Sequence, residues 1–432
     1  AVTVYAGGLV FQQVFGIKEL WGIDFFWIAA IGLVVLTALY TIFGGMKSVL
    51  YTSVLQTPIL LLGSLIILVL GFKELGGWDE MMRVCGAVTV NDYGDTMTNL
   101  IRSNDDANFP WLGALIGSAI IGFWYWCTDQ FIVQRVLSGK NEMEARRGTI
   151  FGAYLKLLPV FLFLIPGMIA FALHQKYIGA GGEGFLPMLE NGTANADAAF
   201  PTLVAKLLPA GVKGLVVCGI LAALMSSLAS LFNSSAMLFT IDFYKRFRPQ
   251  TSEKKLVGIG QVATVVIVIL GILWIPIMRS VGDVLYTYLQ DVQSVLAPGI
   301  AAAFLLGICW KRTSAQGGMW GLISGMVIGL TRLGAKVYYS NAGEVADSTF
   351  KYLFYDMNWL FFCGWMFLFC IIVVIVVSLA TEAPTAEKIQ GLVFGTATKE
   401  QKASTRASWN HWDIIHTVII LAITGAFYWY FW

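Results

Sequence analysis

Charged residues are scarce in this 432-residue chain: Asp, Glu, Lys and Arg together make up 12% of it, about half the share of a soluble domain. Hydrophobic residues make up 57%, and aromatic residues 14%. A water-soluble globule of this length could not bury so much apolar surface. The composition therefore predicts a multi-pass protein of a lipid bilayer. A net charge of +2, without a basic run, excludes a nucleic-acid binder.

Residue patterns that build enzyme and metal sites are also missing. The six cysteines stand singly, without a Cys-x-x-Cys pair, so neither a zinc site nor a disulfide framework is predicted. The three histidines do not form a His-Glu-x-x-His motif, and Gly-x-Ser-x-Gly is absent. No nucleophile and base stand in a recognisable pattern, so we do not expect an enzyme.

Long apolar segments fill most of the chain and predict an all-α fold. A bilayer core needs about 20 apolar residues per spanning helix, and on that measure there are eleven segments. They cover residues 1–17, 21–43, 48–72, 109–134, 148–174, 210–243, 256–278, 284–309, 315–339, 356–380 and 411–432.

The loops between these segments differ in charge. If alternate loops lie on opposite sides of a cell membrane (plasma or inner), one side collects sixteen of the 28 Lys and Arg residues. The positive-inside rule places that side in the cytoplasm. The linker 381–410 is then cytoplasmic, the loop 175–207 is external, and the aromatic C-terminus lies outside.

Polar residues within spanning segments are costly and mark candidate functional sites. Lys156 is the clearest charged one, because residues 150–173 carry no other charge, although a lysine can also extend its amine to the interface. Ala223, Ser226 and Ser227 share one helix face, and their oxygens suit a sodium ion. On spacing alone, serines that simply allow close helix packing are the more frequent case.

A row of aromatic residues, Trp124, Tyr125 and Trp126, lies near the end of segment 109–134. Such a row can form a belt at the membrane interface, and it can also form a flat platform for a sugar ring. In the second case, donors such as Gln290 and Lys156 would bind the sugar hydroxyls.

Several blocks of sequence resemble one family. The block Trp124–Arg135 reads Trp-Tyr-Trp-Cys-Thr-Asp-Gln-x-Ile-Val-Gln-Arg, and Gly152-x-Tyr-Leu-Lys-Leu-x-Pro159 follows it. Together with the runs Leu224–Asp242, Pro298–Arg312 and Ala38–Gly45, these blocks resemble the sodium/solute symporter family over essentially the whole chain. The first block is specific to its sodium/glucose cotransporter branch.

The resemblance implies a LeuT-type fold with two inverted five-helix repeats. Family members have about fourteen spans, so a chain with about eleven is expected to be an N-terminally truncated fragment. Residues 1–72 would form the last three helices of the first repeat, the first of them partial. Residues 109–309 would form the second repeat, and 315–432 the peripheral helices. The missing helices would complete the sodium and sugar sites.

The resemblance also implies roles for individual residues. It assigns Ala223, Ser226 and Ser227 to sodium, and Tyr125, Trp126, Lys156, Thr287 and Gln290 to the sugar, with Tyr125 stacking under the ring. Some positions depart from the family pattern. Gly122 replaces an Asn or Thr that touches the sugar, and Thr287 replaces the Asp of animal glucose transporters. Relatives that couple two sodium ions have Asp and Thr at two positions where this chain has Ser53 and Ala229.

These residues imply sodium-coupled symport of a hexose such as galactose or glucose by alternating access, with one sodium ion per sugar. One alternative is a sodium-coupled symporter of myo-inositol or another polyol. The other is a sugar-gated sensor that conducts ions without accumulating sugar.

Overall fold

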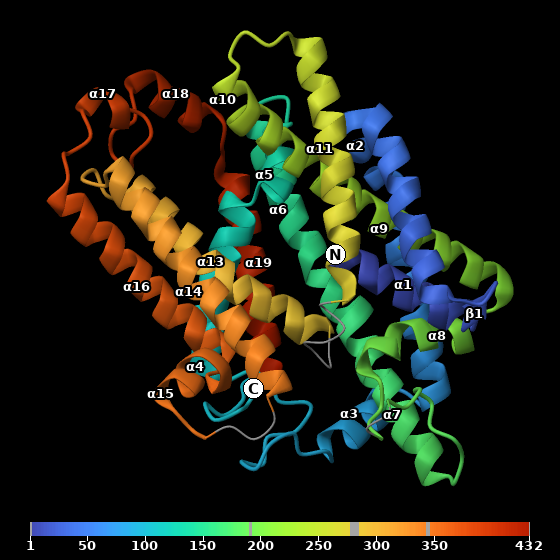
Figure 1. Ribbon diagram of the computed structural model, residues 1–432. Helices are drawn as coiled ribbons and strands as arrows, with labels where there is room; N and C mark the ends of the chain where they lie inside the picture. The colour runs from blue at the N-terminus through green and yellow to red at the C-terminus, as the bar shows by residue number, and fades with distance from the viewer. Residues whose placement is uncertain (1, 190–191, 277–284, 343–345, 432) are drawn as a thin grey trace. The chain divides into compact units, whose positions relative to one another are not determined.

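A computed structural model describes residues 2–189, 192–276, 285–342 and 346–431, without side-chain positions for residues 40, 42–49, 52, 285, 287, 288 and 341. In these ranges the chain is almost entirely helical, as the sequence predicted (Figure 1). The sheet they contain is one short hairpin, in which Glu19–Leu20 (β1) pairs antiparallel with Ile23–Asp24 (β2).

The chain forms two compact units, and each is described by itself. The first unit comprises residues 1–89, 96–98 and 155–285, and the second comprises residues 90–95, 99–154 and 286–432. The units divide the predicted second repeat, residues 109–309, between them. The assignment of segments to repeats and peripheral helices therefore stays a prediction.

The first unit contains the following elements: α1 (Val2–Phe15), α2 (Phe25–Leu75), α3 (Trp78–Gly86), the end of α6 (Glu142–Pro159), the π-helical turn η2 (Val160–Leu164), α7 (Ile165–Gly179), the 3₁₀ turn η3 (Ala196–Ala198), α8 (Ala199–Leu207), α9 (Ala210–Leu238), the π-helical turn η4 (Phe239–Tyr244), α10 (Lys245–Phe247) and α11 (Glu253–Leu273).

Helix α2 bends back along α9. Leu33 packs beside Leu224 of α9, and Ser53 contacts Ser226, only two residues further along α9. On a straight helix, Leu33 and Ser53 would lie about 30 Å apart, so α2 bends between them. Both halves of α2 therefore lie against α9, in agreement with the two spans predicted at 21–43 and 48–72.

The predicted external loop 175–207 is folded back onto the first unit. His174 is buried at the end of the α7 core, and its Nδ1 accepts a hydrogen bond of 3.0 Å from the backbone N–H of Leu186. Lys206 of α8 donates to the carbonyl of Phe185 at 2.8 Å. These two contacts hold adjacent residues of the loop, Phe185 and Leu186, between α7 and α8. Leu203 and Val204 of α8 join the hydrophobic core of this unit.

The second unit contains α4 (Trp111–Phe123), the π-helical turn η1 (Trp124–Thr128), α5 (Gln130–Leu137), most of α6, α13 (Leu285–Cys309), α14 (Ala315–Asn341), α15 (Thr349–Lys351), the π-helical turn η5 (Tyr352–Asp356), α16 (Trp359–Ala380), α17 (Ala386–Ile389), α18 (Lys399–Ala407) and α19 (His411–Tyr430).

A stripe of glycines allows α14 to approach its neighbours closely. Gly317 and Gly321 face Ser378 and Val374 of α16, where an added methyl group would clash. One turn after Gly321, a methyl on Gly325 would lie 2.9 Å from the Cα of Gly299 of α13, and Gly329 lies against the carbonyl of Val295. Four-residue spacing puts these glycines on one helix face, which is the pattern of tight helix packing in membranes.

A compact polar network forms the loop before α4. Asp106 is 4% exposed, and it accepts hydrogen bonds from the backbone N–H groups of Phe109 at 2.7 Å and Asn108 at 2.9 Å. Asn91 and Arg102 also contact its carboxylate. Burial alone would raise the pKa of Asp106, but these donors together hold that pKa below its ordinary value.

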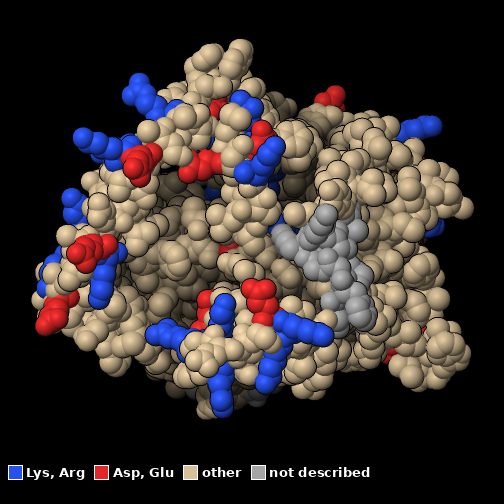
Figure 2. Space-filling model, turned by 90° about the horizontal axis from the view of Figure 1, so that it is seen from above, with Lys and Arg blue, Asp and Glu red and all other residues tan. Residues whose placement is uncertain are grey.

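Eight helices within the described ranges are long and apolar enough to cross a bilayer: Ser53–Leu75, Trp111–Thr128, Glu142–Gly179, Ala210–Phe247, Glu253–Leu273, Leu289–Cys309, Trp359–Ala380 and His411–Tyr430. Two shorter apolar helices, Val2–Phe15 and Phe25–Leu39, accompany them. Their outward faces are apolar, and α19 buries none of its residues. Seen from above in Figure 2, the charged side chains stand in groups, with larger uncharged stretches between them. The fold is that of a multi-pass membrane protein.

Candidate functional site

A pair of serine hydroxyls joins α9 to α2 in the first unit. Ser226 is 6% exposed, and its Oγ lies 2.6 Å from the Oγ of Ser53. The backbone carbonyl of Ser226 accepts a hydrogen bond of 3.0 Å from Ser230. Ser226 therefore makes a contact between helices instead of only bonding within its own helix.

The rest of the predicted sodium face surrounds this pair. Ala223 and Ser227 are half-buried on the same face of α9, and Ala229 is fully buried. Among the residues described, no group of three His, Cys, Asp or Glu side chains could hold a metal ion. A cation bound at this face would use neutral oxygens, those of hydroxyls and backbone carbonyls.

The aromatic residues predicted to bind sugar lie in the second unit, on the π-helical turn η1. Tyr125 and Trp126 are in edge-to-face contact, with ring centroids 5.2 Å apart. Tyr125 is half-buried, whereas Trp126 is 50% exposed. A methyl group built on Gly122, one turn earlier, would meet no atom within 4 Å. Single π-helical turns often occur at functional sites.

Gln290 lies near the start of α13, in the same unit. Its Nε2 donates to the hydroxyl of Tyr286 at 3.3 Å. Further along α13, Ala297 and Ala301 share a hydrophobic cluster with Ile120 and Ile121 of α4, and Trp124 packs against that cluster. Packing thus connects the helix of Gln290 to the aromatic turn.

The other two predicted sugar contacts are not brought to this place by the described structure. The side chain of Thr287 lies outside the described part of the chain. Lys156 is exposed on α6 and belongs to the first unit, so its role as a sugar contact stays a prediction.

Sequence reasoning missed the most deeply buried charge among the described residues, Arg332 on α14. Its guanidinium is fully buried and lies 3.4 Å from Asp291 of α13, the residue after Gln290. Lys336 binds the second carboxylate oxygen of Asp291 at 2.7 Å. The signal is present in the sequence, because an arginine lies well inside the predicted span 315–339.

Helices of spanning length, with neutral and charged polar groups buried between them, define the chain as a multi-pass membrane protein with polar sites in its interior. A family model described as "Sodium:solute symporter family" matches residues 1–325. The chain belongs to the sodium:solute symporter family, and so it is not expected to be an enzyme.

The most similar relatives agree with the predicted sugar branch. The chain is 35% identical to human "Sodium/myo-inositol cotransporter 2" over 407 residues, which are 92% of this chain and 59% of the relative. It is 34% identical to bovine "Sodium/mannose cotransporter SLC5A10" over 458 residues, covering 100% of this chain and 74% of the relative. Mouse "Sodium/glucose cotransporter 4" is 35% identical, over 92% of this chain and 58% of the relative. The chain thus spans about three fifths of the first of these relatives.

A solved structure supports the fold. The substrate-bound, outward-open state of a Na⁺-coupled sialic acid symporter matches with a TM-score of 0.65 at 20% identity, covering 89% of this chain and 75% of that chain. The predicted LeuT-type fold and the predicted family are both confirmed. The residue assignments and the membrane orientation remain predictions.

Proposed function

We propose that the full-length protein is a sodium-coupled symporter of a sugar. The observation that carries this proposal is the hydroxyl pair of the buried Ser226 and the partly buried Ser53, with Ser227 and the Ala223 carbonyl on the same face of α9. Neutral oxygens at membrane depth can bind a small monovalent cation and release it again. The relatives that carry myo-inositol, mannose or glucose in their names favour a sugar or polyol as the other cargo.

The proposed transport follows alternating access. Sodium binds at the Ser226 face and favours the outward-open state, and the sugar then stacks on Tyr125 and bonds to Gln290 and Lys156. Both are released to the cytoplasm. One charge that crosses a potential of 100 mV contributes about 2.3 kcal/mol. Since ~1.4 kcal/mol is a factor of ten, voltage alone supports roughly fiftyfold accumulation at one sodium per sugar.

The proposed substrate is a hexose such as galactose or glucose. The edge-to-face pair of Tyr125 and the 50% exposed Trp126 offers aromatic surface on which a sugar ring can stack. Myo-inositol has a ring of similar size and shape, so it is the second candidate, and two of the relatives above carry myo-inositol and mannose in their names.

Uptake into proteoliposomes tests the function. With full-length protein and an inward sodium gradient, radiolabelled galactose, glucose, mannose and myo-inositol are compared one at a time. We expect at least one of them to accumulate above its external concentration, and to stop accumulating when potassium replaces sodium. A sensor would instead give sugar-dependent current without accumulation, and accumulation without sodium would contradict coupling.

A further inference from the structure

Arg332 is fully buried in the second unit, and three different elements hold it. Its guanidinium donates to the carbonyl of Met357, just before α16, at 2.8 Å and to the carbonyl of Leu353 of η5 at 3.4 Å. It contacts Asp291 of α13 at 3.4 Å and lies over the ring of Phe362 of α16, 4.0 Å from its centroid. Arg332 thus ties the start of α13 to the segment between α14 and α16.

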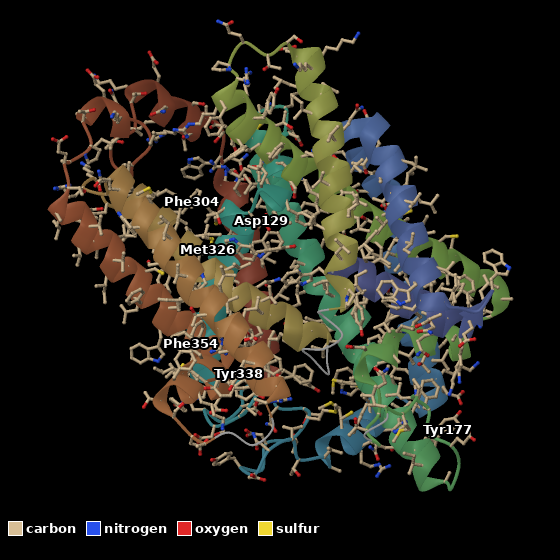
Figure 3. The ribbon with its side chains drawn as sticks, in the orientation of Figure 1. Asp129, Tyr177, Phe304, Met326, Tyr338 and Phe354 are labelled. Carbon is tan, nitrogen blue, oxygen red and sulfur yellow. The ribbon has the colours of Figure 1, made fainter. Side chains whose placement is uncertain are left out.

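The glycine stripe of α14 explains why these charges meet. Gly329 contacts Val295, and the two helices run antiparallel from that contact. Arg332 comes one turn after Gly329, and Asp291 comes one turn before Val295, so the two side chains reach the same level. In Figure 3, Met326 lies near the middle of α14 and Tyr338 near its end, and Phe354 of η5 lies toward the Tyr338 end; Arg332 comes between Met326 and Tyr338 in the sequence.

Helix packing alone does not require these charges. Apolar residues of similar volume are often as stabilising as a buried ion pair, whereas a buried pair that loses one partner destabilises strongly. Two cations hold one carboxylate here, each on a different oxygen: Arg332 on Oδ1 and Lys336 on Oδ2. Asp291 is therefore held from two sides, and its rotation is restricted.

We propose that Arg332 is a positioning residue: it holds Asp291, and with it the first turns of α13, so that the adjacent Gln290 is oriented toward the sugar. This inference rests on the proposed function, because it takes Gln290 as a sugar contact. It goes beyond that function because Arg332 itself touches no substrate. The amide of Gln290 already bonds to Tyr286 on the same helix, so its direction depends on how these turns are held.

Sugar uptake by variants of the full-length protein tests the role of Arg332, with galactose as the probe, or myo-inositol if only that accumulates. We expect Arg332→Met and Asp291→Asn each to raise the sugar KM about tenfold. The maximal rate per transporter in the membrane should change less than twofold, about the scatter of such measurements. The sodium concentration for half-maximal uptake at saturating sugar should not change, because the serine face lies in the other unit.

Arg312→Met is the matched control. Arg312 also donates to two backbone carbonyls, those of Thr381 at 2.7 Å and Leu379 at 3.4 Å, but it lies beyond the other end of α13. We expect its sugar KM to stay at the wild-type value. If Arg312→Met raises KM as much as Arg332→Met, the effect is a general one of lost packing and the proposal is overturned.

A double-mutant cycle asks whether Arg332 acts through Gln290. In a Gln290→Ala background, Arg332→Met should raise KM little further, and an equal increase in both backgrounds would overturn the proposal. If Arg332→Met does not reach the membrane, the nearly isosteric Asp291→Asn takes its place, and an unchanged KM there is equally decisive. If Gln290→Ala itself leaves KM unchanged, the sugar contact in the proposed function fails. If only the Arg332 and Asp291 variants leave it unchanged, this inference alone fails.

Discussion

The two units each contain a polar group buried among apolar helices, and the two groups differ in kind. In the first unit, Ser226 and Ser53 form one hydrogen bond between neutral hydroxyls. In the second, Asp291, Arg332 and Lys336 form a charged cluster with additional bonds to backbone carbonyls. A neutral hydroxyl loses little when its partner changes, whereas a buried charge that loses its partner is strongly destabilising.

Neutral hydroxyls suit a site that binds and releases a cation, whereas a charged cluster suits a site that holds helices in place. A site that loads and releases a cation in each cycle must pass through states with and without a positive charge, and hydroxyls tolerate both. The Asp291 cluster would become unbalanced if any of its members left, so it is suited to hold helices in place. We therefore propose sodium binding for the Ser226–Ser53 pair and a positioning role for the Asp291 cluster.

The largest effect is expected from removing the hydroxyl site. Ser226→Ala combined with Ser227→Ala removes two oxygen ligands without a replacement, so sodium-dependent uptake should fall to background. The measurement is initial uptake at several external sodium concentrations. Ser234→Ala is the control. Ser234 is buried on the same helix, and its hydroxyl donates a hydrogen bond of 3.0 Å to the carbonyl of Leu231 within that helix. Unchanged sodium affinity in the double variant would mean that these serines only pack helices.

A smaller effect is expected at the sugar contacts. Gln290→Ala and Lys156→Ala should each raise the sugar KM, because a buried sugar hydroxyl that loses its partner costs about 1–3 kcal/mol. Tyr125→Phe should raise KM less than Tyr125→Ala, since stacking needs the ring more than the hydroxyl. Concentration series of sugar uptake at saturating sodium measure both. If Phe is as damaging as Ala at position 125, the hydroxyl is the working part.

Much of this arrangement could be predicted from the sequence, because the bilayer fixes the length of its helices. Each of the eleven predicted segments overlaps a helix of the structure. The common face of Ala223, Ser226 and Ser227 follows from helix periodicity alone. The contact between Ser226 and Ser53 did not follow, because it joins residues 173 positions apart through a bend in α2.

The charged cluster could not be read from hydropathy in the same way. A hydropathy average over a window of residues dilutes one arginine among many apolar neighbours, so hydropathy alone does not single out Arg332. The stripe Gly317, Gly321, Gly325 and Gly329 was visible in the sequence, and it marks the face that packs closely. Tertiary packing decides which helix that face meets. Asp291 is the partner of Arg332 because the face packs against α13.

Stoichiometry sharpens the comparison, because one substitution would make the neutral site resemble a charged one. A second sodium ion needs a carboxylate near the serines. This chain has Ser53 and the fully buried Ala229 at the two positions where the family resemblance predicts Asp and Thr in two-sodium relatives. We expect one sodium per sugar in the wild type. Ser53→Asp, alone or with Ala229→Thr, should move the coupling toward two.

Reversal potentials of reconstituted full-length protein distinguish the two ratios. The sugar gradient that balances transport rises linearly with the sodium gradient for one ion and quadratically for two. A quadratic dependence in the wild type would mean that another acid supplies the charge. Asp242 of η4 is one candidate, whereas Asp129 already accepts a hydrogen bond from the N–H of Phe131 as the cap of α5.

The smallest effect is expected from a carboxylate outside the membrane, which water and protons can reach. Asp106 has a lowered pKa, so its contribution to stability is fully present above the unfolded pKa of about 4 and is lost as pH falls through the folded value. Asp106→Asn should weaken the loop before α4 by about 1–2 kcal/mol at pH 7, since bonds to a charged group are replaced by weaker ones. Hydrogen exchange of the N–H groups of Asn108 and Phe109 measures this opening.

The difference in exchange rate between wild type and Asp106→Asn should shrink below pH 4. The control Asp105→Asn, at an exposed neighbour, should exchange at the wild-type rate. A difference that persists unchanged at pH 3 would show that the shape of the side chain, and not its charge, holds the loop.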